Sequence, residues 1–144
     1  MIDSSLRTVE WKDNKVVMID QTKLPNQLVF VTYDDYNQVA DAIRNLVVRG
    51  APAIGVSGAF GLALASLQSK ATTKDELISD LEKARKILYD TRPTAVNLKW
   101  GLDKIMIVAN SGNTVDQIKQ SVINEAKKMA EEDIQINKTM GKYG

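Results

Sequence analysis

The sequence predicts an α+β protein in which a small antiparallel sheet, within residues 1–33, precedes a bundle of about five helices, within residues 34–144. Short apolar segments separated by turn residues occupy the N-terminal part, as in a set of strands. Beyond residue 33 the apolar residues recur at the spacing of helices. Strands and helices are therefore segregated along the chain, which favours the α+β class over α/β.

The composition excludes several classes of function. Hydrophobic residues make up 44% and charged residues 26% of the 144 residues, as in globular proteins. A net charge of +1 gives no broad field to attract nucleic acid or a membrane, so we expect neither as a partner. Without cysteine or histidine, thiolate and imidazole chemistry and most zinc sites are excluded, and we expect no metal ion or cofactor. No signal peptide begins the chain, so we expect a cytoplasmic location.

The predicted strands cover residues 8–11, 16–19 and 28–31, with turns at Asp13-Asn14 and Pro25-Asn26. A first helix should follow Tyr33, with Asp34 or Asp35 as its N-cap and Gly50 at its end. Its buried stripe should contain Tyr36, Val39, Ile43 and Leu46.

A second helix should begin at Pro52 and run to about Gln68. The run 51–67 is apolar apart from two serines, but it is short for a membrane span, so we expect a buried helix. Three glycines at 55, 58 and 61 do not match a nucleotide-binding motif, and close packing against a neighbouring helix explains them better.

The remaining three helices are predicted from capping residues and breakers. Thr73 and Glu76 have capping-box spacing before the third helix, and Thr114 and Gln117 cap the fifth. Pro93 should start the fourth helix, and we expect Gly141 to close the fifth. The fourth should run through Val96, Trp100 and Ile105 and end at Ser111-Gly112-Asn113.

Two aromatic residues and one ion pair have a structural interpretation. Large aromatic side chains are mostly core anchors, so Trp11 and Trp100 are both expected to be structural. Asp103 follows Lys99 by one helical turn, which predicts a surface ion pair worth less than about 1 kcal/mol.

Two segments are candidate anion sites. Arg49 and Gly50 precede the helix that starts at Ala51-Pro52, so a guanidinium, free N–H groups and the positive end of a helix dipole could face one phosphate. Arg92 precedes Pro93 in the same way. The alternative is that each arginine caps the helix before it, and local chemistry leaves both interpretations open.

The segments Val47-Val48-Arg49-Gly50-Ala51-Pro52-Ala53-Ile54-Gly55 and Thr91-Arg92-Pro93-Thr94-Ala95-Val96-Asn97-Leu98 resemble signature segments of the methylthioribose-1-phosphate isomerases. That family is related to the ribose-1,5-bisphosphate isomerases and to the regulatory subunits of translation initiation factor 2B. The resemblance implies an aldose–ketose isomerase of methionine salvage that converts methylthioribose 1-phosphate to methylthioribulose 1-phosphate. It assigns substrate binding to Arg49, Gly50, Ala51 and Arg92.

The resemblance also implies a second, Rossmann-like domain that holds the catalytic cysteine and aspartate. We expect that domain to be absent from this chain, which would leave no catalytic residue in it and make it inactive alone. The full-length protein is expected to be a homodimer. Two alternatives remain: a ribose-1,5-bisphosphate isomerase, and a non-catalytic regulatory subunit like the alpha, beta and delta subunits of initiation factor 2B.

Overall fold

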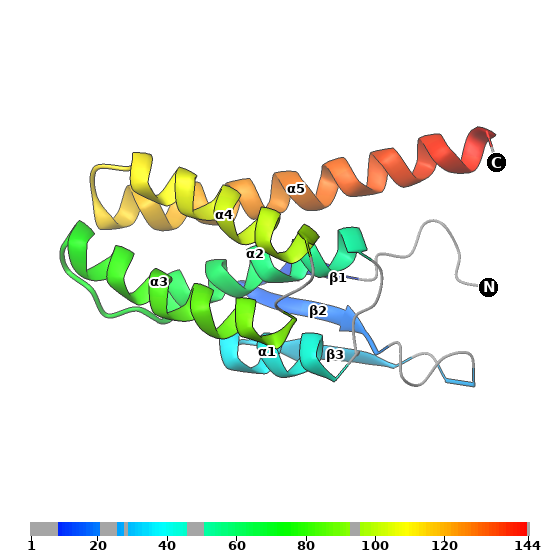
Figure 1. Cartoon of the computed structure of the whole chain (residues 1–144), viewed down its shortest axis with the longest axis horizontal. Coiled ribbons are helices and arrows are strands. Elements are labelled where there is room, and N and C mark those ends of the chain that lie inside the picture. Colours follow the sequence, from blue (N-terminus) through cyan, green and yellow to red (C-terminus); the bar gives the residue numbers. More distant parts are fainter. Residues whose placement is uncertain (1–8, 21–25, 28, 46–50, 93–95, 144) are drawn as a thin grey trace.

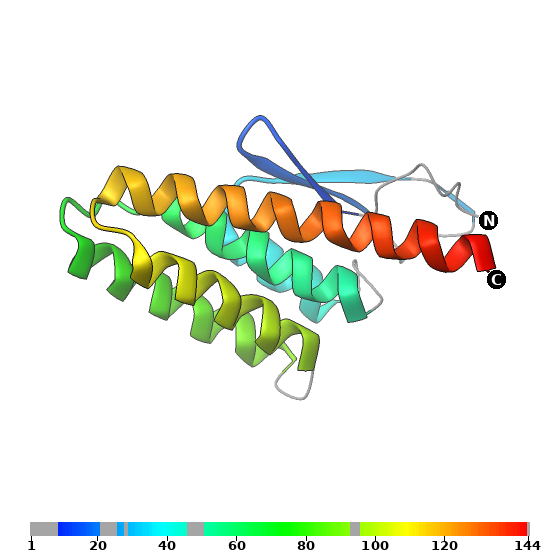
Figure 2. The same ribbon diagram turned by 90° about the horizontal axis from the view of Figure 1, so that it is seen from above.

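A computed structural model describes residues 9–20, 26–27, 29–45, 51–92 and 96–143; for residues 51–52 and 132–143 it describes the backbone alone. Within these described ranges three strands precede five helices, which confirms the predicted α+β class. Figure 2 shows the sheet on one side of helix α2 (Ala51–Gln68), with α3 (Lys74–Thr91) and α4 (Val96–Ser111) on the other. Helix α2 is thus the centre of a layered molecule.

The sheet is an antiparallel meander of β1 (Val9–Lys12), β2 (Lys15–Ile19) and β3 (Phe30–Tyr33). Asp13 and Asn14 join β1 to β2 with φ angles of 54° and 61°, the left-handed values that a two-residue hairpin turn requires. The predicted turn is therefore confirmed. β3 begins two residues later than predicted, and Leu28 lies outside the described residues.

Cross-strand pairing places one set of side chains on the face of the sheet that packs on the helices. Val9 pairs with Met18, and Val16 pairs with Tyr33. Trp11 belongs to the same face, and its ring lies 5.6 Å from that of Phe60 in α2, centroid to centroid. Trp11 is therefore a structural contact between sheet and bundle, as predicted.

Helix α1 (Tyr36–Arg44) begins where the sequence predicted, because Asp35 Oδ1 accepts a hydrogen bond of 2.8 Å from the N–H of Asn37. Its end was predicted wrongly. The helix stops at Arg44 rather than Gly50, with Asn45 as C-cap donating its N–H to the carbonyl of Asp41. Leu46, predicted on its buried stripe, lies outside the described residues.

Helix α2 is buried on every side along its central part, from residue 54 to residue 66. Its two buried serines, Ser57 and Ser66, donate to carbonyls of their own helix, at 2.7 Å each, so neither hydroxyl is left unsatisfied. The prediction of a buried helix is confirmed. Within the described residues, no helix combines the length and apolarity needed to span a membrane.

Helix α3 has the predicted cap. Thr73 Oγ1 accepts from the N–H of Glu76 at 3.3 Å, while Glu76 Oε2 accepts from the N–H of Thr72 at 3.2 Å. Its inner face consists of Leu77, Leu81, Ala84 and Leu88, all buried.

Of the three residues through which the fourth helix was expected to run, only Ile105 is buried in α4. Leu98, Leu102 and Ile105 face the core, whereas Val96 is 78% and Trp100 54% exposed. The prediction that Trp100 is a core anchor was therefore wrong. The described helix starts at Val96, and the predicted start at Pro93 lies outside the described residues.

Helix α5 (Val115–Tyr143) is capped as predicted: Gln117 donates its N–H to Thr114 Oγ1 at 3.1 Å. It passes through Gly141, which was expected to end it. A glycine inside a helix costs about 1 kcal/mol relative to alanine but does not forbid the helical conformation. The helix extends well past the other four (Figure 1).

Candidate functional site

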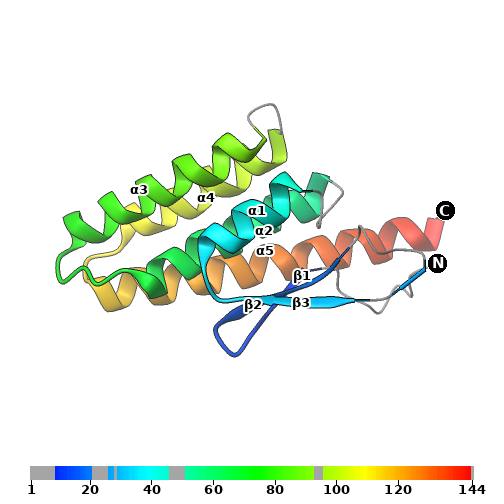
Figure 3. The same cartoon turned by 90° about the horizontal axis from the view of Figure 1, so that it is seen from below.

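The candidate site lies at the end of the bundle where α2 and α4 begin and α3 ends. Figures 1 and 3 show that α2 and α4 run in the same direction, with α3 antiparallel to both. The N-termini of α2 and α4 are therefore at the same end of the molecule. Each helix N-terminus presents free backbone N–H groups and about half a positive charge, so the two together favour an anion.

Arg92 is placed at this end, as the residue that follows the last turn of α3. Its backbone N–H donates to the carbonyl of Tyr89 at 3.2 Å, and its φ of −148° and ψ of 75° take the chain out of the helix. This conformation suits the residue before a proline, since Pro93 disfavours the helical region for its predecessor. The side chain of Arg92 is half-buried.

The other predicted site residues are only partly described. Ala51 is the first residue of α2, one residue before the predicted start at Pro52, but its side-chain surroundings are not described. Arg49 and Gly50 lie outside the described residues, so their roles stay predictions. The structure thus places Arg92 and the start of α2 at a common end of the bundle.

The two helix starts are held together by close backbone contact. A Cβ atom built on Gly101 would lie 2.5 Å from the carbonyl oxygen of Gly55, and one on Gly55 would lie 2.8 Å from the carbonyl oxygen of Asn97. A Cβ on Gly58, one turn further on, would meet the side chains of Leu98 and Leu102. The predicted packing role of these glycines is confirmed, and Gly101 is a partner that the sequence analysis missed.

A cluster of three charged side chains links α4 to α3. Asp103 accepts a hydrogen bond from Arg85 of α3, and Lys99 Nζ lies 3.3 Å from its other oxygen. The hydrogen bond from Arg85, with Lys99 adding to it, lowers the pKa of Asp103 from its usual value. The predicted Lys99–Asp103 pair is present. Arg85 was missed because it lies 18 residues away, beyond the reach of any helical spacing.

On its other side α4 is linked to α5. Lys104 Nζ lies 3.4 Å from Glu125 Oε1 and 5.0 Å from the centre of the Trp100 ring. A lysine above an indole contributes roughly 0.5–1 kcal/mol at an exposed site. Trp100 therefore has a partner, although it is not in the core.

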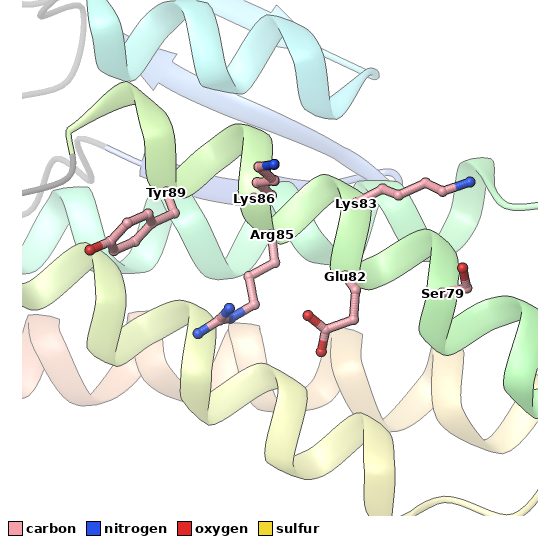
Figure 4. A pocket seen from close by; sticks show the side chains of 6 residues that line it. All are labelled: Ser79, Glu82, Lys83, Arg85, Lys86 and Tyr89. Carbon is pink, nitrogen blue, oxygen red and sulfur yellow. The ribbon is translucent and has the colours of Figure 1, made fainter.

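A surface hollow on α3 is a poor candidate for a phosphate site. It is lined by Ser79, Glu82, Lys83, Arg85, Lys86 and Tyr89, all from one helix. Figure 4 shows Glu82 and Arg85 pointing toward α4, while Lys86 points away from it, so the charges do not converge. Arg85 is already bonded to Asp103. Among the described residues no group of acidic side chains is arranged to hold a metal ion.

Comparison with known proteins agrees with the proposed resemblance. The chain is 44% identical over 142 residues to the methylthioribose-1-phosphate isomerase of Geobacter metallireducens, covering 97% of this chain and 41% of that protein. It is 47% identical over 140 residues to the putative methylthioribose-1-phosphate isomerase of Pyrococcus horikoshii, covering 96% and 38%. The chain thus spans about two fifths of the length of the curated relatives it matches.

Two crystal structures share the fold. The 5-methylthioribose 1-phosphate isomerase of Pyrococcus horikoshii matches with a TM-score of 0.90 at 42% identity, covering 99% of this chain and 43% of that one. Subunit delta of translation initiation factor eIF-2B from A. fulgidus matches with a TM-score of 0.85 at 44% identity, covering 90% and 38%. The model of the initiation factor 2 subunit family matches residues 47–144, which include both arginine motifs. The chain belongs to the initiation factor 2 subunit family.

Proposed function

We propose that this chain is the substrate-binding N-terminal part of an isomerase that converts methylthioribose 1-phosphate to methylthioribulose 1-phosphate. The observation that carries the proposal is the placement of Arg92, directly after the last turn of α3, at the end of the bundle where the parallel helices α2 and α4 start. Relatives named as this isomerase, at 44% and 47% identity over nearly the whole chain, support this substrate.

The chemistry of the substrate fits this end of the molecule. A sugar phosphate carries a compact, doubly charged phosphate group. The free backbone N–H groups at a helix N-terminus already point outward, so they bind such a group without a change of conformation. A guanidinium adds two parallel hydrogen bonds to phosphate oxygens, and we assign this role to Arg49 and Arg92. Gly50 and Ala51 would let the backbone approach the phosphate closely.

In the proposed mechanism, the residues that bind the phosphate do not carry out the acid–base step. A phosphate on C1 prevents simple opening of the sugar ring, so the enzyme must polarise the ring oxygen and then move hydrogen between C1 and C2. We assign these steps to a Rossmann-like second domain of the full-length protein. Arg49, Arg92 and the two helix starts would orient the substrate and bear its charge.

A regulatory subunit is the second candidate, and the likeness to subunit delta of eIF-2B favours it. The same anion site would then sense a phosphorylated ligand without converting it. We prefer the enzyme because the relatives from Geobacter metallireducens and Pyrococcus horikoshii carry the name of the isomerase, the second as a putative one. By the same resemblance we propose a cytoplasmic homodimer.

The test uses the full-length product of the gene that contains this sequence. Purified protein is incubated with methylthioribose 1-phosphate and, in parallel, with ribose 1,5-bisphosphate, and the ketose product is followed by NMR. Turnover of the first substrate supports the proposal, and turnover of the second alone would replace it with the bisphosphate isomerase. Binding of either compound without turnover, together with association with translation factors, would favour the regulatory subunit.

A further inference from the structure

The contact between α2 and α4 is made by backbone atoms, which cannot rotate aside. A Cβ on Gly101 would lie 2.5 Å from the oxygen, 3.1 Å from the carbonyl carbon and 3.3 Å from the Cα of Gly55. A Cβ on Gly55 would lie 2.8 Å from the carbonyl oxygen of Asn97 and 3.4 Å from its carbonyl carbon. Real Cβ atoms essentially never come within 3.0 Å of such atoms. The two glycines therefore set how closely the two helices approach.

The contact is one turn away from the proposed phosphate site. Gly55 lies in the second turn of α2, which begins at Ala51, and Gly101 lies in the second turn of α4, which begins at Val96. The favourable effect of a helix dipole falls off within the first turn, so two N-termini act on one anion only when both are close to it. A contact this near the helix starts fixes their separation directly.

We propose that Gly55 and Gly101 are positioning residues, which hold the N-termini of α2 and α4 at the separation where both bind the same phosphate. This inference rests on the proposed function. Alanine at position 101 would need the helices to part by at least about 0.5 Å to bring its Cβ to 3.0 Å. A misplacement of about 1 Å in a binding site can cost about 100-fold in rate, so even a partial shift is measurable.

Gly58 provides a matched control within the same helix pair. A Cβ at Gly58 would lie 2.6 Å from Cδ1 of Leu98 and 3.3 Å from Cδ2 of Leu102. These are the ends of flexible side chains, so a small rotation makes room and the helix axes need not move. The same substitution at Gly58 therefore changes the packing but leaves the separation of the helix starts unchanged.

The experiment compares Gly101→Ala, Gly55→Ala and Gly58→Ala in the full-length protein, with KM, kcat and melting temperature measured for each. Phosphate binding is present in both the ground state and the transition state, so its loss raises KM more than it lowers kcat. We expect KM for methylthioribose 1-phosphate to rise at least about tenfold in Gly101→Ala, less in Gly55→Ala, and to stay unchanged in Gly58→Ala.

A stability control separates positioning from packing. Leu77 is fully buried in the first turn of α3, at the other end of the bundle, so Leu77→Ala lowers the melting temperature without touching the helix starts. An unchanged KM in both Gly101→Ala and Gly55→Ala would overturn the inference, as would KM values that follow melting temperature in all four variants. If Gly101→Ala does not fold, the smaller displacement in Gly55→Ala decides the question.

Failure of the proposed function would look different. Wild-type protein that turns over no methylthioribose 1-phosphate refutes the proposed function, and the inference with it, before any variant is measured. Active wild-type protein with no KM effect at Gly101 or Gly55 refutes the inference alone.

Discussion

Replacing Phe60 tests how the sheet is joined to the helices. Phe60 is 1% exposed in the middle of α2, and its ring meets Trp11 of β1 at an interplanar angle of 31°. Removing a buried phenylalanine side chain costs about 3–5 kcal/mol, which includes the cavity left behind. We therefore expect Phe60→Ala to lower the free energy of unfolding of the 144-residue chain by that amount.

The expected shift in melting temperature follows from the chain length. An unfolding entropy of about 2.1 cal/mol/K per residue gives about 0.3 kcal/mol/K for 144 residues. A loss of 3–5 kcal/mol then lowers the melting temperature by about 10 to 17 °C. A milder change, Phe60→Leu, combined with Trp11→Leu in a double-mutant cycle, should show a coupling of about 0.5–1.5 kcal/mol for the ring pair.

The assay uses the two tryptophans of the chain. Trp100 is 54% exposed, so Trp100→Phe should change stability by less than about 1 kcal/mol and leaves Trp11 as the only indole. Urea unfolding of this variant, followed by fluorescence and by circular dichroism, reports the sheet contact and the helices separately. The account of the core would be refuted if Phe60→Ala lowered the free energy of unfolding by less than about 1 kcal/mol. It would also be refuted if this substitution left the emission of Trp11 unchanged.

Four further predictions follow from the site and the caps. The purified 144-residue chain should show no isomerase activity, and any enzyme-dependent conversion of methylthioribose 1-phosphate by it would contradict the proposed mechanism. In the full-length protein Arg49→Ala and Arg92→Ala should each raise KM or lower kcat/KM, at about 1.5–3 kcal/mol for each charged hydrogen bond removed, and wild-type kinetics in both would favour helix capping. Thr73→Ala should destabilise the chain by about 1 kcal/mol in urea unfolding, whereas Thr73→Ser should be nearly neutral because it keeps the capping oxygen. The pKa of Asp103 in the folded chain lies below its usual 3.8. Its contribution to the stability of the fold is therefore present above pH 3.8 and is lost as the pH falls through the folded pKa. In acid unfolding experiments Asp103→Asn should therefore not show this loss of stability. An equal loss of stability in the variant and the wild type would contradict the prediction.

Features set by neighbours in the sequence were predicted well. The caps at Thr73 and Thr114 each need only a residue three positions away, and the Asp13-Asn14 turn needs only its own two residues. Packing over longer distances was not predictable in this way. Nothing near Asp103 in the sequence indicates Arg85, and nothing near Gly55 indicates Gly101, because both pairs form only when α4 docks.

Helix ends and helix faces were less predictable, for two reasons. A glycine permits a helix to end but does not require it, so Gly141 lies within α5. The apolar residues of α4 occupy more than one face, so spacing alone did not show that Leu98 and Leu102 are buried while Val96 and Trp100 are not. For the site, the structure shows only that Arg92 follows the last turn of α3. The substrate-binding roles of Arg92 and Arg49 stay predictions.

The complete burial of α2 also bears on how this protein is made in the cell. The ribosome releases α2 before α3, α4 and α5, three of the helices that cover it. Until those later segments emerge, a helix with thirteen successive core positions, 54 to 66, has only the sheet and α1 to shield it from water. A nascent chain at that stage would present a strongly apolar segment to chaperones, and slow synthesis beyond Gln68 should increase both chaperone binding and aggregation.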